Sequence, residues 1–387
     1  MARHAKRLIA GPWIYLSMAV ALGIVAASVG EVQAHKAITS KYDYNKDVYP
    51  LLRDHCGQCH VTGGPAPMTL LTYKDAVAWA EAVRDELSTE RMPPWPIDPE
   101  GPAVKGVHSI NAKDIDTIVT WASGGTPHGD TNIVLPTTTF TSQWKLGAPD
   151  LKVEMDAPHT VAPGTLDETC DFTLPTGLTE TKWVKAVDLM PGLATLARDA
   201  IISIENGPVL ALWQPGGDPI VAPSGAAFKL PAGAKLHLQI HYKKHFDAEQ
   251  DATTDKSTIG LYFTDPPVSG RELQSLAIEG PAAADAMRRL DASLSGAARI
   301  VAVRPLLDQP YLSVTVAAVS PSGARVPLLT LRNARPQWFR RYWLQEPVEV
   351  AAGSKIEVTA TPLPPNADEP KTQKRFEFQV ALDYVPQ

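Results

Sequence analysis

The chain has 387 residues, a formal net charge of −6 at neutral pH and 44% apolar residues. This length allows two or three domains with a sizeable core. The acidic balance leaves no basic footprint for nucleic acid, so we exclude that class of partner. The 35 prolines and 26 glycines indicate many turns and loops rather than disorder, because the apolar fraction stays high.

Residues 1–34 are typical of an export signal. Three basic residues before position 8 precede an apolar stretch over residues 14–29, and Val32-Gln33-Ala34 offers a small-x-small cleavage site. We therefore expect a periplasmic or otherwise exported protein. The alternative is an uncleaved anchor that holds the chain at the membrane, because the apolar stretch is barely shorter than a spanning helix.

The most informative stretch is Cys56-Gly57-Gln58-Cys59-His60, the attachment signature for haem c. Two thiols one helical turn apart can add to the two vinyl groups of one porphyrin. The adjacent His60 can then bind the iron as proximal ligand. A redox Cys-x-x-Cys or half of a zinc site is the alternative, but the following histidine and the lack of a second cysteine pair disfavour it.

The third cysteine, Cys170, has no partner in the chain if Cys56 and Cys59 hold haem. We expect it to be buried as a small hydrophobic residue.

Residues 42–130 are predicted to form a small helical domain around the haem. Helical spacing of apolar residues predicts helices over residues 47–54, 73–87 and 111–123. Asn111 is a good N-cap for the third helix, and Gly124 ends it. Three helices around a haem are the minimum of a class I cytochrome c.

The sixth iron ligand is predicted to be Met92, in Arg91-Met92-Pro93-Pro94-Trp95, because the prolines stiffen the loop that presents it. Met68 lies only eight residues after His60 and is poorly placed to cross to the opposite face. Met68, His108 and an open position are the alternatives. A methionine ligand favours electron transfer, whereas an open position permits ligand chemistry.

From about residue 148 the sequence is typical of an all-β fold. Many short strands separated by Pro, Gly and Asp clusters imply β-sandwiches. The strand runs are expected over residues 183–189, 235–242, 257–263, 312–319, 326–331 and 355–360. The Ala-rich stretch 282–294 is expected to be a short inserted helix or loop.

Three motifs lie within the stretch 49–130: His55-Cys56-Gly57-Gln58-Cys59-His60, Ala66-Pro67-Met68 and Met92-Pro93-Pro94-Trp95. Three more follow it: Trp144-Lys145-Leu146-Gly147, Gln239-Ile240-His241-Tyr242 and Gln337-Trp338-Phe339-Arg340-Arg341-Tyr342. With these motifs the stretch 49–130 resembles the cytochrome c module fused to bacterial copper type II, ascorbate-dependent monooxygenase-like proteins, and the later motifs resemble the same family.

This resemblance implies two jelly-roll-like sandwiches, as in peptidylglycine hydroxylating monooxygenase. We place the linker at 131–149 and the sandwiches at 150–275 and 276–387. In that family each sandwich carries one copper; one copper stores an electron while the other binds dioxygen. The ligands are a His-His pair with the histidine of Gln-x-His-Tyr, and His-x-His with a methionine.

This sequence departs from the family at those positions. Only His241 is retained, and no histidine follows His245 and no methionine follows Met287. The second sandwich therefore cannot supply the family's ligands, and we expect no copper. Arg198, Asp199 and Arg304 stand near the missing ligands and either form a new polar site or fill the former copper pockets as paired charges.

His237 and His241 alternate with apolar residues, so both are expected on one face of a strand, about 13 Å apart. A single copper on His241 with His159 or His237 is one alternative. A hydrogen-bonded remnant is the other.

The sequence therefore predicts an exported haem c protein that passes electrons to a redox partner protein, with the sandwich half acting in docking or assembly. A copper monooxygenase supplied with electrons by its own haem is the competing hypothesis. A haem enzyme acting on peroxide or a small ligand is the third.

Overall fold

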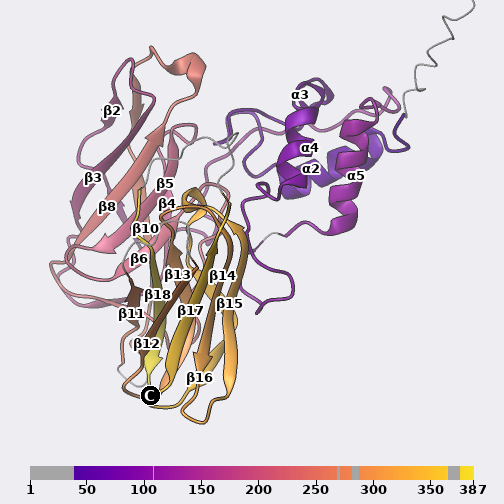
Figure 1. Ribbon diagram of the computed structural model, residues 1–387. Coiled ribbons are helices and arrows are strands. Elements are labelled where there is room, and N and C mark those ends of the chain that lie inside the picture. The colour runs from indigo at the N-terminus through magenta and orange to yellow at the C-terminus, as the bar shows by residue number, and fades with distance from the viewer. Residues whose placement is uncertain (1–38, 108, 268–270, 281–286, 365–374) are drawn as a thin grey trace, which may run out of the picture.

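The computed structural model describes residues 39–107, 109–267, 271–280, 287–364 and 375–387. These residues form a helical part followed by two β-rich parts (Figure 1). The prediction of a β-rich multidomain chain with few helices is thus confirmed. The expected export signal over residues 1–34 lies outside the described residues, among which no helix is long and apolar enough to cross a membrane.

The helical part contains a short π-helix and four α-helices. They are η1 (Tyr44–Val48), α2 (Tyr49–His55), α3 (Tyr73–Ala78), α4 (Ala80–Ser88) and α5 (Ala112–Ser123). Asn111 caps α5 as expected, because its Oδ1 accepts from the Asp114 amide at 3.0 Å. The helix predicted over residues 73–87 is divided at Trp79, whose ψ of 5° leaves the helical range.

An aromatic cluster forms the core of the helical part. Tyr44 and Trp121 are fully buried, and the Tyr44 ring meets Tyr73 edge to face at 5.6 Å. The Tyr44 hydroxyl donates to the Leu70 carbonyl at 2.9 Å. This bond ties the loop that follows the Cys-x-x-Cys-His motif to the helices.

The first β-rich part consists of two four-stranded antiparallel sheets and a two-stranded ribbon. One sheet has the order β1 (Leu151–Glu154), β10 (Thr258–Thr264), β4 (Lys182–Met190), β7 (Phe228–Leu230). The other has the order β3 (Asp167–Pro175), β8 (Lys235–Lys243), β5 (Ala197–Ile204), β6 (Val209–Trp213). The ribbon pairs β2 (His159–Val161) with β9 (Thr253–Asp255), and a short 3-10 helix, η2 (Phe246–Ala248), lies between β8 and β9.

The core of this part follows strand alternation. In β8, Leu236, Leu238, Ile240 and Tyr242 are fully buried, whereas the intervening residues are partly exposed. The predicted placement of His237 and His241 on one face of the strand is therefore confirmed.

The second β-rich part consists of two further four-stranded sheets. One has the order β11 (Gln274–Glu279), β18 (Gln379–Pro386), β13 (Ala298–Leu306), β16 (Tyr342–Val350). The other has the order β12 (Arg288–Ser293), β17 (Lys355–Pro362), β14 (Tyr311–Val319), β15 (Arg325–Ala334), with the 3-10 helix η3 (Pro336–Trp338) before β16.

The expectation of a helix or loop over residues 282–294 is wrong for its described portion. Residues Arg288–Ser293 form the edge strand β12, which pairs with β17 through Leu290 opposite Val358. Alternating burial explains the strand: Arg288 is buried while Arg289 and Asp291 are exposed. The alternation of buried and exposed residues was missed because the many alanines in this stretch favoured a helix or loop. Residues 282–286 lie outside the described part.

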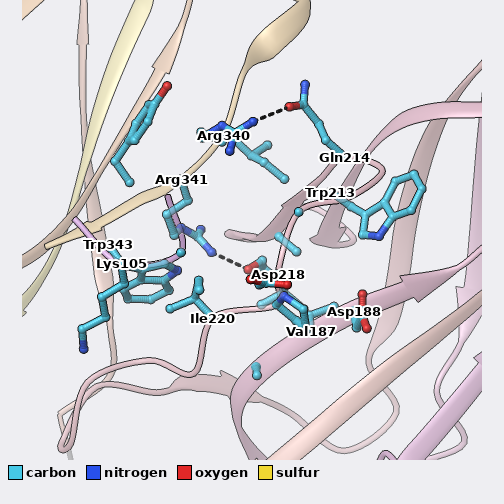
Figure 2. Close-up of a pocket in the computed structure, with 18 of the residues that line it drawn as sticks. Lys105, Val187, Asp188, Trp213, Gln214, Asp218, Ile220, Arg340, Arg341 and Trp343 are labelled. Carbon is cyan, nitrogen blue, oxygen red and sulfur yellow. Dashed lines mark hydrogen bonds between the residues drawn. The ribbon is translucent and has the colours of Figure 1, made fainter. Parts of the chain in front are cut away.

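Arg340 lies where the three parts meet (Figure 2). Its Nη2 donates to the Pro94 carbonyl and to Gln214 Oε1, each at 3.1 Å, and its guanidinium lies 3.7 Å from the centre of the Trp95 ring. The loop that carries Pro94 and Trp95 also pairs with β15, where the Asp98 amide donates to the Thr330 carbonyl at 3.0 Å. One side chain thus joins the helical part to both β-rich parts.

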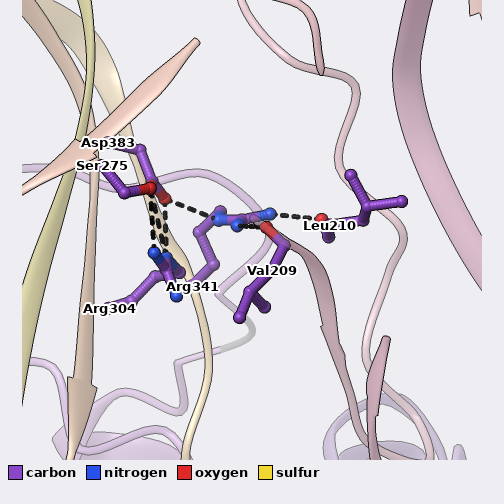
Figure 3. Close-up of polar contacts among 6 residues, drawn as sticks. All are labelled: Val209, Leu210, Ser275, Arg304, Arg341 and Asp383. Carbon is purple, nitrogen blue, oxygen red and sulfur yellow. Dashed lines mark hydrogen bonds and ion pairs between the residues drawn. The ribbon is translucent and has the colours of Figure 1, made fainter. Parts of the chain in front are cut away.

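The next residue, Arg341, joins the two β-rich parts (Figure 3). Its Nε donates to Asp383 Oδ2 at 2.7 Å, while its terminal nitrogens donate to the carbonyls of Val209, at 2.6 Å, and Leu210. Arg304 Nε also donates to Asp383 Oδ2, at 2.9 Å. Asp383 is completely buried, so its charge is balanced by two guanidinium groups within the interior.

Replacing Asp383 by Asn should lower the free energy of unfolding by about 3 to 5 kcal/mol, because two buried guanidinium groups lose their counter-charge. Urea denaturation of the full chain measures this loss. The matched control is Glu357→Gln, which removes the partner of Arg325 at an exposed pair. That change should cost less than about 1 kcal/mol. Equal losses in the two variants would contradict a special role for the buried network.

Candidate functional site

The Cys-x-x-Cys-His motif continues directly from α2. Cys56 caps this helix with its amide donating to the Leu52 carbonyl at 2.9 Å, and the Cys59 and His60 amides both donate to the Cys56 carbonyl, at 3.1 and 2.9 Å. A Cβ at Gly57 would lie 2.5 Å from the Arg53 carbonyl oxygen, so only glycine fits there. The two thiols are therefore presented by one tight turn.

His60 is oriented by a single backbone contact. Its Nδ1 lies 3.2 Å from the Met68 carbonyl oxygen, which can only accept, so Nδ1 carries the proton and Nε2 carries a lone pair. Burial lowers the pKa of His60, which keeps the ring neutral at neutral pH. A neutral imidazole with a fixed tautomer is the form that binds a metal through Nε2.

The same contact places Met68. Its backbone lies at the Nδ1 edge of the His60 ring, away from Nε2. The expectation that Met68 is poorly placed to act as the sixth ligand stays a prediction.

Both motif thiols are free and half-buried. Burial raises the pKa of Cys56 to about 12 and that of Cys59 to about 11, so each is a neutral thiol at neutral pH. Cys59 Sγ lies 3.6 Å from the Pro215 carbonyl oxygen, and a Cβ at Gly216 would lie 2.5 Å from the same sulfur. The second thiol thus packs against the loop after β6.

A cavity of about 350 Å³ adjoins the motif. Gly57, Gln58 and Val61 line it from the helical part, and the loop after β6 lines it from the first β-rich part. Gln58 Oε1 is buried beside it without a hydrogen-bond partner among the described residues. Cys56, Cys59 and His60 are not among the residues that line this cavity. Two free thiols and a neutral imidazole are the donor types that haem c attachment uses.

Met92 lies in the loop that follows α4, two residues before Pro94, whose carbonyl accepts a hydrogen bond from Arg340. Its amide donates to the Glu86 carbonyl at 3.2 Å, and its side chain is half-buried. Its assignment as the sixth ligand stays a prediction, and the alternative His108 lies outside the described residues.

A smaller cavity of about 90 Å³ lies at the junction of the three parts (Figure 2). Asp188 lines both cavities, and burial raises its pKa to about 6 although the Leu189 amide donates to it at 2.8 Å. Sequence reasoning missed Asp188. The signal in the sequence was an acidic residue within an apolar run of the predicted strand, between Val187 and Leu189.

His241 has both ring nitrogens engaged by carboxylates. Nδ1 lies 2.9 Å from Asp199 Oδ2, and Nε2 lies 2.8 Å from Asp167 Oδ1. Burial alone would lower the pKa of His241, but the hydrogen bonds and charges of Asp199 and Asp167 raise it above the ordinary value. Arg375 balances the buried Asp199 at 2.5 Å. The ring is thus held as a cation, whereas a copper ligand must offer a free lone pair.

His237 and His159, the two histidines considered as partners of His241, do not join it. His237 pairs with Asp171 at 3.1 Å on the same sheet face, two strand alternations away. His159 contacts Glu168 and Cys170, which face the same side as Tyr242, the side opposite to His241.

Arg198 and Arg304, both singled out from the sequence, are paired separately. Arg304 belongs to the Asp383 network, and Arg198 Nη1 donates to the Pro65 carbonyl in the helical part. Arg198, Asp199 and Arg304 therefore form separate paired contacts rather than one new polar site.

No protein-family model and no curated protein matches this chain. Among solved structures, it is similar to the major capsid protein P2 of bacteriophage PM2, at 9% identity over 61% of this chain and 96% of that chain, with a TM-score of 0.29. It is also similar to a Paenibacillus xanthan lyase, at 12% identity over 65% of this chain and 28% of that chain, with a TM-score of 0.18. A Bacillus subtilis oxalate decarboxylase matches at 9% identity over 75% and 87%, with a TM-score of 0.13.

Replacing His241 by Gln should destabilise the chain by about 1 to 3 kcal/mol in acid, because a charged hydrogen-bonded ring is lost. The folded pKa is raised, so this stabilisation is fully present below the ordinary value of 6.5 and is lost as pH rises through the folded pKa. Urea denaturation at several pH values measures the difference. The control His237→Gln, at a more exposed pair, should cost less. A loss from His241→Gln that grows with rising pH would contradict this account.

Proposed function

We propose that this chain is an exported c-type cytochrome that transfers single electrons to a redox partner protein. The observation that carries the proposal is the pairing of two free thiols, presented by one turn, with a histidine whose Nδ1 is already occupied by the Met68 carbonyl. Export follows from the proposal, since haem c is attached on the outer side of the cytoplasmic membrane.

In this proposal Cys56 and Cys59 hold the haem covalently, and His60 Nε2 is the proximal ligand. The bound haem supplies an iron that cycles between two oxidation states. The Met68 carbonyl fixes the tautomer and orientation of His60, and such a bond raises the basicity of a ligand. Met92 is proposed as the distal ligand, which favours electron transfer over ligand chemistry.

The sandwich half is proposed to act in docking or assembly. Its loop at Pro215 contacts Cys59, and Arg340 donates a hydrogen bond to the Pro94 carbonyl in the loop that carries Met92. Both sides of the proposed haem site therefore depend on the β-rich parts, which supports a role in building and shielding that site.

The competing copper monooxygenase has no observation in its favour at His241. Both ring nitrogens there are hydrogen-bonded to aspartates, so copper binding would require breaking these contacts.

The first test is covalent haem attachment in a host that matures cytochromes c. We expect one haem per chain by intact mass after denaturation, and none in the Cys56→Ala, Cys59→Ala double variant. The matched control Cys170→Ala should keep one covalent haem. Covalent haem in the double variant, or none in the parent chain, would overturn the proposal.

The second test concerns Met92. Met92→Ala should abolish the sulfur-to-iron charge-transfer band of the oxidised protein and lower its midpoint potential, because a thioether ligand favours reduced iron. The control Met68→Ala should keep the band. Potentiometry of the parent should give a one-electron slope of about 59 mV per tenfold change in ratio. An unchanged band in Met92→Ala rejects the assignment.

A further inference from the structure

The inner face of β3 carries polar residues where the rest of the sheet buries apolar ones. Cys170 stands opposite Ile240 and Glu168 opposite Tyr242 in the ladder with β8, and both partners are fully buried. Cys170 packs against the hydrophobic core as expected, but it is half-buried rather than fully buried. A carboxylate and a thiol thus lie side by side at the margin of the core.

His159, from β2, completes a cluster with these two side chains. Its Nε2 lies 2.7 Å from Glu168 Oε1 and 3.4 Å from Cys170 Sγ. The three candidate ligand atoms lie within 4.8 Å of one another. The spacing is close to that of ligands around a single ion, so binding requires only small movements of the side chains.

The imidazole is held in this position by its neighbours. It stacks on the Tyr242 ring at 5.3 Å and meets Phe172 edge to face at 5.6 Å. Tyr242 is fixed in turn, because its hydroxyl donates to the buried Asp255 at 3.0 Å. His159 also stands opposite Asp255 in the β2 and β9 ladder. The ring orientation is therefore set before any ion arrives.

We propose that His159, Glu168 and Cys170 form a binding site for one divalent cation of the zinc type. Imidazole nitrogen, carboxylate oxygen and thiolate sulfur are the ligands that Zn²⁺ takes, with water in the fourth tetrahedral position. The site is separate from the haem motif and from His241, so it does not depend on the proposed function.

Ion binding must displace one proton. A free cysteine thiol, with an ordinary pKa of about 8.5, is protonated near neutral pH, and only the thiolate binds a metal. On binding, the sulfur–hydrogen bond breaks, the proton leaves to solvent and the thiolate bonds to the ion. His159 Nε2, which donates its proton to Glu168 in the free chain, gives up that proton while Nδ1 takes one up, so the neutral ring offers its Nε2 lone pair to the ion. Binding therefore releases about one proton per chain from Cys170, and the affinity rises with pH.

The consequence of binding is structural. β3 is the edge strand of its sheet, and β2 belongs to the separate ribbon with β9. An ion held by His159 on β2 and by Glu168 and Cys170 on β3 cross-links the ribbon to the edge strand of the sheet. The cross-link stabilises an edge that no further described strand of this sheet covers.

The test uses Zn²⁺ alone and the full chain with Cys56 and Cys59 replaced by Ala, so that Cys170 is the one remaining cysteine and the result does not depend on haem attachment. Calorimetry should give one zinc per chain, and zinc X-ray absorption should give one sulfur neighbour at about 2.3 Å. Cys170→Ser and His159→Gln should each weaken binding at least tenfold and remove or alter that signal. The matched control His237→Gln, on the opposite sheet face, should bind like the parent.

Urea denaturation of each variant without zinc checks that the variant is folded. A loss of zinc binding in a folded variant can then be assigned to the replaced ligand. Zinc should also stabilise the parent chain, and Cys170→Ser should show little of this gain. No zinc binding by the parent, no sulfur neighbour, or equal affinity in the parent and Cys170→Ser would each overturn the proposal.

Discussion

Two consecutive arginines hold the three parts of this chain together. Burial lowers the pKa of Arg340 and of Arg341 to about 10, so both stay charged in the interior. A buried guanidinium costs several kcal/mol unless it is paired. Arg341 finds Asp383 and two carbonyls, and Arg340 finds a carbonyl, an amide oxygen and the Trp95 ring. Asp383 lies in the same β-rich part as Arg341, whereas the carbonyl and amide partners lie in the other parts, so the hydrogen bonds of both guanidinium groups are complete only in the assembled arrangement.

In our proposal these contacts give the β-rich half a structural role that does not require copper. The loop beside Cys59 and the loop that carries Met92 are both fixed by contacts that cross between parts. In our proposal the helical part supplies the two thiols and His60, while the β-rich parts supply the residues that surround the haem site. His241 is held by ion pairs with Asp167 and Asp199, which stabilise the exposed face of its sheet.

Local patterns predicted local structure well. The alternation of β8, the Asn111 cap and the six predicted strand runs, which match β4, β8, β10, β14, β15 and β17, were predicted from the sequence, since each depends on neighbouring residues. The pairs that fix the molecule could not be read in this way. Arg341 and Asp383 lie 42 residues apart, and Arg340 and Pro94 lie 246 apart. Periodicity says nothing about such partners, and the same limit hid the meeting of His159 with Cys170.

The most direct measurement is to count iron and copper per chain in protein matured with haem c, in the parent and in His241→Gln and Cys170→Ser. After copper loading and dialysis, the account predicts one covalently held iron in all three and no copper that depends on His241. Absence of covalent iron from the parent would contradict it. One copper per chain lost in His241→Gln but kept in Cys170→Ser would also contradict it and favour the monooxygenase.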